Sequence, residues 1–239
     1  MAAQFRGKVA LIAGGTGGLG RAVSLAFLRA SARVIVTWRR QEEFAALAND
    51  AADHRDLLTG LELDVTDEAA TQQRLGGVIG DMGGIDILVN AVGGYAGGTP
   101  LWSISPEVWD RMMALNLRSG YSLCRAVVPL MLNRARGRIV NVASRAAFDH
   151  AAGAAAYAAS KAAAVAMMDS LAADLRGKGI RVNSVIPSII DTEANRRAMP
   201  NSDFTKWPKP EEIANVILFL CSDDAKLIHG ASIPVYGDS

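Results

Sequence analysis

The chain has 239 residues, half of them hydrophobic, and its 25 basic and 24 acidic side chains leave a formal net charge of +1. A chain of this length and composition can bury a substantial core within one larger domain. The balanced charge argues against a nucleic-acid-binding surface, and the longest apolar stretches are far shorter than the roughly 20 residues that span a bilayer.

Short apolar runs alternate with helical patterns along the whole chain. This alternation predicts an α/β fold, in which a mostly parallel sheet carries helices on both faces. No repeat or linker interrupts the series, so we expect a single domain over residues 1–239. The apolar runs predict seven strands, near 8–13, 33–37, 61–65, 85–91, 138–143, 180–186 and 232–236. Helices are expected between them, and the clearest patterns lie near 18–30, 105–134, 154–177 and 211–221.

A glycine-rich segment joins the first predicted strand to the first predicted helix. Gly14, Gly18 and Gly20 are spaced G-x-x-x-G-x-G at this junction. Glycine lets the backbone turn tightly and approach a diphosphate, and a helix N-terminus offers unpaired N–H groups to the anion. Strand, glycine turn and helix together indicate a dinucleotide-binding site, with a plain tight turn as the alternative.

The second predicted strand ends at Trp38, which Arg39 and Arg40 follow. In dinucleotide-binding folds an acidic residue at this place accepts hydrogen bonds from the ribose 2′-hydroxyl of NAD. Here a tryptophan takes that place, and a guanidinium fork suits the 2′-phosphate of NADP. We therefore expect NADP(H), with NAD(H) as the alternative; the two arginines could also be a solvated charge pair.

Tyr157 and Lys161 stand four residues apart in a predicted helix, thirteen residues after Ser144. Positions i and i+4 share a helix face, so the phenol and the ammonium should be neighbours. A neighbouring cation lowers the pKa of a phenol, which is about 10 when free. A phenol tuned in this way can pass a proton to or from an alcohol or carbonyl oxygen. Alone, such a pair on a helix is usually a coincidence of the surface.

Together these motifs resemble the short-chain dehydrogenase/reductase family, over nearly the whole chain. The resemblance implies a Rossmann-type doubly wound domain and hydride transfer between a nicotinamide and a carbonyl or secondary alcohol. The chain departs from the family pattern at Ala13, Val89 and Ser188, and Gly17 lies where many NADP-using relatives carry a basic residue. Further matching segments are Leu63-Asp64-Val65, Asn90-Ala91-Val92-Gly93, Asn116, Ser144 and Pro187 to Thr192.

The resemblance assigns roles to particular residues. Tyr157 would be the general acid in reduction, and Lys161 would lower its pKa and hydrogen-bond the nicotinamide ribose. Ser144 would donate to the substrate oxygen, and Asn116 would hold a water that links Lys161 to solvent. The residues expected to bind the cofactor are Gly14, Thr16, Gly18, Leu19, Gly20, Trp38, Arg39, Asp64, Val65, Asn90, Ala91, Gly93, Tyr157, Lys161, Pro187, Ile190 and Thr192.

The substrate is expected to lie under a small lid near 189–209. Within it, residues 191–207 are similar to the corresponding segment of dihydropteridine reductases, so pteridine reduction is one alternative. Ser144 and the pair Trp38-Arg39 point instead toward carbonyl reductases such as the 3-oxoacyl-carrier-protein reductases. A dinucleotide-sensing protein without catalysis is the remaining alternative.

Other expectations concern partners and location. The helix near 154–175 carries few polar residues, which suggests that it also contacts a second copy, and the family resemblance implies a homodimer or homotetramer. The N-terminus lacks the apolar core of a signal peptide, and two cysteines far apart suit a reducing cytoplasm. Three scattered histidines show no ligand spacing, so we expect no metal site.

Overall fold

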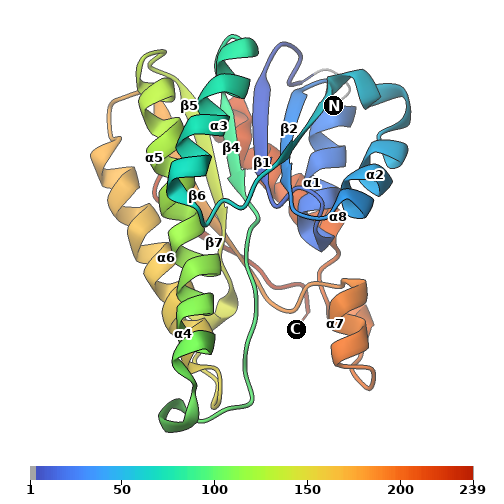
Figure 1. The fold of residues 1–239 in the computed structure, drawn as a ribbon, viewed down its shortest axis with the longest axis vertical. Helices are drawn as coiled ribbons and strands as arrows, with labels where there is room; N and C mark the ends of the chain where they lie inside the picture. Colours follow the sequence, from blue (N-terminus) through green and yellow to red (C-terminus); the bar gives the residue numbers. More distant parts are fainter. Residues whose placement is uncertain (1–3, 239) are drawn as a thin grey trace.

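The computed structural model describes residues 4–238 and arranges them around one seven-stranded sheet with helices on both faces (Figure 1). The strands lie in the order β3-β2-β1-β4-β5-β6-β7, and every neighbouring pair is parallel. The expected doubly wound α/β fold is therefore confirmed, with a sheet that is wholly parallel. The strands are β1 (Val9–Ala13), β2 (Arg33–Trp38), β3 (Leu58–Glu62), β4 (Ile87–Asn90), β5 (Gly137–Val142), β6 (Ile180–Pro187) and β7 (Ser232–Val235).

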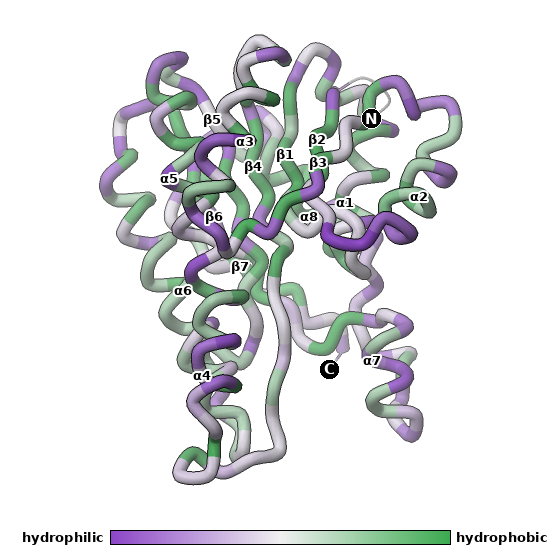
Figure 2. Tube along the Cα trace, viewed as in Figure 1, coloured by the Kyte–Doolittle hydropathy of each residue, from purple (hydrophilic) through white to green (hydrophobic). Residues whose placement is uncertain are grey.

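Alternate residues of the strands face two separate hydrophobic layers, as the two-residue period of a strand requires. In β1, Ala10 and Ile12 join the core shared with α1 and α8, whereas Leu11 and Ala13 join the core shared with α3, α5 and α6. Figure 2 shows hydrophobic residues along the central strands and hydrophilic ones on the outer helices. The α-helices are α1 (Gly18–Arg29), α2 (Gln41–Asp50), α3 (Glu68–Asp81), α4 (Pro106–Met113), α5 (Ser119–Leu132), α6 (Ala155–Asp174), α7 (Glu193–Ala198) and α8 (Pro210–Cys221).

Strand β3 begins and ends three residues earlier than the expected 61–65. It pairs with β2 from Val34 opposite Leu58 to Trp38 opposite Glu62. Because β2 ends at Trp38, the backbone beyond Glu62 has no neighbouring strand to join. Leu63 and Val65 are nevertheless buried, and their apolar pattern is what suggested a longer strand.

The single helix expected over 105–134 is divided. Between α4 and α5 lies a π-helical turn, Ala114–Arg118, which contains the buried Asn116. Its amide accepts a hydrogen bond from the Gly94 N–H and donates one to the Gly94 carbonyl, both at 3.0 Å. A π turn in an otherwise α-helical stretch is often found at functional sites.

The loops that leave the carboxyl ends of the strands gather at one edge of the sheet. There β1 has β2 on one side and β4 on the other, so the chain reverses its direction of winding between these neighbours. Such a switch point in a parallel sheet is the usual place for a ligand. Helices α4 and α7 extend beyond the sheet at this edge (Figure 1).

Candidate active site

The glycine turn after β1 is fixed by the strand and helix around it. Gly14 has a φ of +71°, which glycine adopts without strain, and its N–H donates to the Thr37 hydroxyl at 3.0 Å. From within α1, Ser24 donates to the carbonyls of Gly15 and Gly20, at 3.0 and 2.8 Å. A Cβ at Gly20 would overlap the Gly14 carbonyl oxygen. The turn therefore requires glycine at Gly20 as well as at Gly14.

Helix α1 begins directly after this turn with an uncapped N-terminus. Its N-cap residue is Gly17, which has no side chain to accept from the first N–H groups, and the first turn carries no acidic residue. These groups and the positive end of the helix dipole suit an anion. Gly14, Thr16 and Gly17 line the adjacent cleft, so a diphosphate fits the turn.

Gly20→Ala is expected to weaken NADPH binding by about tenfold or more, because the added methyl would displace the Gly14 carbonyl and open the turn. Gly76→Ala is the matched control, since Gly76 lies in α3, does not line the cleft, and a Cβ there would meet nothing within 4 Å. Its Kd should stay within about twofold of wild type. Fluorescence titration with NADPH measures both, and equal affinities for the two variants would contradict the assignment of the turn.

A cleft of about 490 Å³ runs from the glycine turn past the ends of β2 and β4. Eight of the expected binding residues line it: Gly14, Thr16, Trp38, Arg39, Asp64, Val65, Ala91 and Gly93. The cleft also includes seven residues that the sequence motifs did not single out for binding: Gly17, Thr37, Arg40, Glu43, Leu63, Val92 and Leu115.

Other residues that were expected to bind the cofactor do not line the cleft but stabilise the elements around it. The Asn90 amide donates to Asn141 at 3.1 Å and accepts from the Val92 N–H at 3.2 Å, which ties β4 to β5 and shapes the following loop. Thr192 caps α7, and its methyl would lie 2.8 Å from a Cβ placed on Gly18. Gly18 and Leu19 form the first turn of α1, Pro187 ends β6, and Ile190 packs against the core beside α1.

Charged groups are paired at the end of the cleft beside β2. Arg39 lies 3.6 Å from the Asp64 carboxylate, and Arg40 pairs with Glu43. Partial burial acts to raise the pKa of Asp64, but hydrogen bonds from Thr66 and the charge of Arg39 outweigh it, so the pKa is lowered. The Trp38 ring stacks on Phe44, with centroids 5.5 Å apart.

Ser144 and Tyr157 meet beside the cleft. Ser144 follows β5, Tyr157 lies in the first turn of α6, and the two hydroxyl groups are hydrogen-bonded. Burial raises the pKa of Tyr157; the Ser144 hydrogen bond opposes this, and Tyr95 adds to it. The Tyr95 ring meets the Tyr157 ring edge-on, with centroids 5.0 Å apart. Tyr157 is therefore a protonated phenol at neutral pH.

Lys161 was expected to lower the pKa of Tyr157; here that pKa is raised, by burial and by Tyr95 against the Ser144 hydrogen bond, and Lys161 is not among the groups that shift it. The Lys161 side chain reaches β5 instead, where its Nζ donates to the Val142 carbonyl at 3.0 Å. It is 5% exposed, and burial lowers the pKa of Lys161 from its ordinary value of 10.5 to about 8. The i, i+4 spacing places the two side chains on one helix face, and the hydrogen bond to Val142 fixes where the ammonium lies.

Asn116 and Ser160 connect the π turn to the helix that carries Tyr157. The Asn116 amide donates to the Ser160 hydroxyl at 3.0 Å, which donates to the Tyr157 carbonyl at 2.8 Å. A Cβ on Gly93 would lie 3.0 Å from Asn116 Oδ1 and 3.1 Å from Lys161 Nζ, so Gly93 joins the cleft to this cluster. Sequence reasoning missed Ser160, although its place beside Lys161 in a nearly apolar helix was a signal.

The segment 189–209 is held together largely by its own side chains. Arg196 binds both oxygens of Asp191, at 2.5 and 2.8 Å, and its guanidinium lies over the Phe204 ring. Phe204 packs on Trp207, which is 6% exposed. These contacts explain the aromatic residues of the segment as packing within the segment itself.

Two absences hold for residues 4–238, the part of the chain that the structure describes. Within that range, no group of three or more His, Cys, Asp or Glu residues is placed to hold a metal ion. No helix of the same residues is long and apolar enough to cross a membrane.

Comparisons with known proteins agree with one another. The family model described as short chain dehydrogenase matches residues 8–203. D-threitol dehydrogenase from Mycolicibacterium smegmatis is 36% identical over 243 residues, covering 98% of this chain and 93% of that protein. A 3-oxoacyl-acyl-carrier-protein reductase from Thermotoga maritima is 34% identical over 242 residues, covering 98% of each protein. The structure of ElxO with NADP bound has a TM-score of 0.90 and 25% identity, and covers 96% of this chain and 97% of that one.

Proposed function

The chain belongs to the short-chain dehydrogenase family, and on this premise we propose that it is an NADP(H)-dependent oxidoreductase that interconverts a carbonyl and a secondary alcohol. The observation that carries the proposal is the junction at Gly93. This residue lines the cleft and lies against Asn116 and Lys161, and Lys161 stands one turn after Tyr157 in α6. A ligand filling the cleft would therefore end beside a proton donor.

The residues of the cleft suit a dinucleotide in three parts. The glycine turn and the uncapped N-terminus of α1 would hold the diphosphate. Trp38, Arg39, Asp64 and Val65 would surround the adenosine. Gly93 and Lys161 would hold the other ribose, and a bound nicotinamide supplies or accepts the hydride.

Proton transfer falls to Tyr157 and its partner Ser144. Because burial raises the pKa of Tyr157, the phenol carries its proton at neutral pH and can donate it to a carbonyl oxygen. The Ser144 hydroxyl can donate to the same oxygen as negative charge develops there. In the oxidising direction the phenol must first release this proton to solvent, and the phenolate can then accept the proton of the alcohol. Lys161 and the Asn116–Ser160 contacts hold α6 against β5 and the loop after β4.

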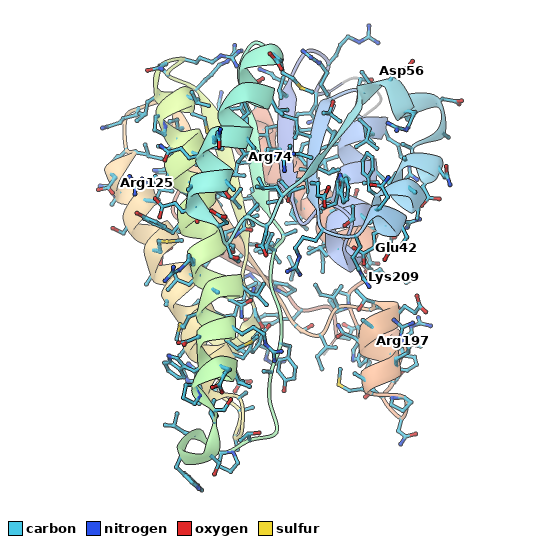
Figure 3. The ribbon with its side chains drawn as sticks, in the orientation of Figure 1. Glu42, Asp56, Arg74, Arg125, Arg197 and Lys209 are labelled. Carbon is cyan, nitrogen blue, oxygen red and sulfur yellow. The ribbon has the colours of Figure 1, made fainter. Side chains whose placement is uncertain are left out.

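The preference for NADP(H) is supported by Arg39 and by the NADP-bound relative. It predicts that replacing Arg39 weakens the binding of NADPH more than that of NADH. Arg39→Gln should weaken NADPH binding by about tenfold and change NADH binding by less than about twofold, because only NADPH carries the 2′-phosphate. Arg125→Gln is the control: Arg125 lies on α5, away from the cleft, where it pairs with Glu68 (Figure 3).

Fluorescence titrations of the wild-type protein and of the two variants with both cofactors give the six dissociation constants. Tighter binding of NADH than of NADPH by the wild-type protein would contradict the preference. An equal loss of both cofactors in Arg39→Gln would assign Arg39 to the adenine instead.

Segment 189–209 completes the proposal as the substrate lid. Thr192 brings it against the glycine turn, and its aromatic residues stabilise the lid itself. The likeness to dihydropteridine reductases therefore needs no pteridine to explain Phe204 and Trp207. A carbonyl or alcohol substrate fits the Ser144–Tyr157 pair better.

A further inference from the structure

Glu43 places a carboxylate in the cofactor cleft that the proposed function leaves without a role. It lies in the first turn of α2 and lines the cleft together with Thr16, Arg39 and Arg40. Its Oε2 accepts from the Thr16 hydroxyl at 3.2 Å, and its Oε1 pairs with Arg40. The Glu43 side chain is 29% exposed, against 67% for Arg40. Glu43 is thus held between the glycine turn and the arginine.

These contacts change the charge that a cofactor meets at the end of β2. Arg39 is matched by Asp64, and Arg40 is matched by Glu43, so the four side chains carry no formal net charge. A phosphate monoester brings about −1.5 to −2 charges at pH 7. It must compete with Glu43 for Arg40 and is repelled by the carboxylate. A 2′-hydroxyl meets no such repulsion and can donate to a carboxylate.

We propose that Glu43 is a cofactor-specificity residue that weakens the binding of NADP(H) and keeps the cleft open to NAD(H). The inference rests on the proposed function, because it assumes that the adenosine ribose lies at the end of β2. Arg39 favours the phosphate and Glu43 opposes it, so the selectivity of the wild-type protein is the balance of the two.

The test is Glu43→Gln, which keeps the length of the side chain and an oxygen that accepts from Thr16 and removes only the charge. It should lower the Kd for NADPH by about tenfold and leave the Kd for NADH within about twofold. Glu42→Gln is the matched control, because Glu42 is the preceding residue of the same helix, is exposed, and lies at the surface of α2 (Figure 3). It should change neither constant.

The dependence of NADPH binding on salt concentration distinguishes an electrostatic effect of Glu43→Gln from a change in the shape of the cleft. This end of the cleft is open to solvent. Raising the salt concentration to about 0.5 M should therefore reduce the factor by which Glu43→Gln binds NADPH more tightly than the wild-type protein does. The inference would be overturned if this tighter binding of NADPH did not change with salt concentration. It would also be overturned if Glu43→Gln bound both cofactors more tightly, or if Glu42→Gln bound NADPH more tightly by the same factor. Weaker binding of both cofactors by Glu43→Gln would overturn it too, because Glu43 would then act by positioning the Thr16 hydroxyl.

Titration of the wild-type protein distinguishes this failure from that of the proposed function. If the wild-type protein binds neither dinucleotide, the proposed function fails and the inference fails with it. If it binds them and Glu43→Gln leaves their ratio unchanged, the inference alone fails.

Discussion

Tyr157→Phe is expected to lower carbonyl turnover by about 10³-fold while the Kd for NADPH stays within about twofold of wild type. The change removes the phenolic hydroxyl, which is the proton donor, and keeps the ring that packs edge-on against Tyr95. Binding should survive because the glycine turn and the β2 end of the cleft lie on other elements. The expected signature is therefore a loss of turnover without a loss of cofactor.

A panel of carbonyl compounds, followed by NADPH absorbance, supplies the substrate for this comparison. Tyr121→Phe is the control, since it removes the same hydroxyl from an exposed tyrosine on α5 that contacts Arg125. It should leave turnover unchanged. Full turnover by Tyr157→Phe would contradict the proton-transfer role, and NADPH binding by wild type without turnover of any carbonyl would favour a sensing protein.

Lys161→Met is expected to lower turnover by roughly 10²-fold or more and at the same time to stabilise the fold. Burial lowers the pKa of Lys161 from 10.5 to about 8, which corresponds to roughly 3 kcal/mol against the charged form. Methionine fills a similar volume without a charge but loses the hydrogen bond to Val142. We therefore expect a gain of roughly 1 to 3 kcal/mol in the free energy of unfolding at pH 7.

The pH dependence of this gain follows from the same shift. Between pH 8 and 10.5 the unfolded lysine binds a proton that the folded one has released, so the wild-type protein becomes more stable as pH rises through this window. The unfavourable contribution of Lys161 is fully present below about pH 8. The advantage of Lys161→Met in urea unfolding should therefore be largest at pH 7 and shrink toward pH 10.

Lys178→Met, at an exposed lysine after α6, is the control and should change stability little at either pH. A Lys161→Met protein that is less stable than wild type at pH 7, or an advantage that is independent of pH, would contradict the account of the buried ammonium.

The sheet and its order of elements were predictable because apolar strands and amphipathic helices repeat along the chain. The boundaries that failed depend on tertiary partners. Strand β3 ends at Glu62 because β2 ends opposite it, and the helix expected over 105–134 is divided by a π turn where Asn116 binds Gly94. Neither partner is visible from local sequence.

The candidate site shows the same division. Motif spacing predicted that Ser144, Tyr157 and the glycine turn belong to one site. It did not predict that Lys161 would reach Val142 or that Glu43 would meet Thr16, because both contacts join elements far apart in the chain. The homo-oligomer and the cytoplasmic location stay predictions.

The most direct test of the central claim is deuterium transfer from NADPH that carries deuterium in place of both hydrogens at the nicotinamide C4 position. With an active carbonyl substrate, the wild-type protein should yield an alcohol that carries one deuterium on the former carbonyl carbon, as measured by mass spectrometry. Tyr157→Phe should bind the same cofactor and form this product at least about 100 times more slowly. Product without deuterium, or equal rates for the two proteins, would contradict hydride transfer at this site with Tyr157 as the proton donor.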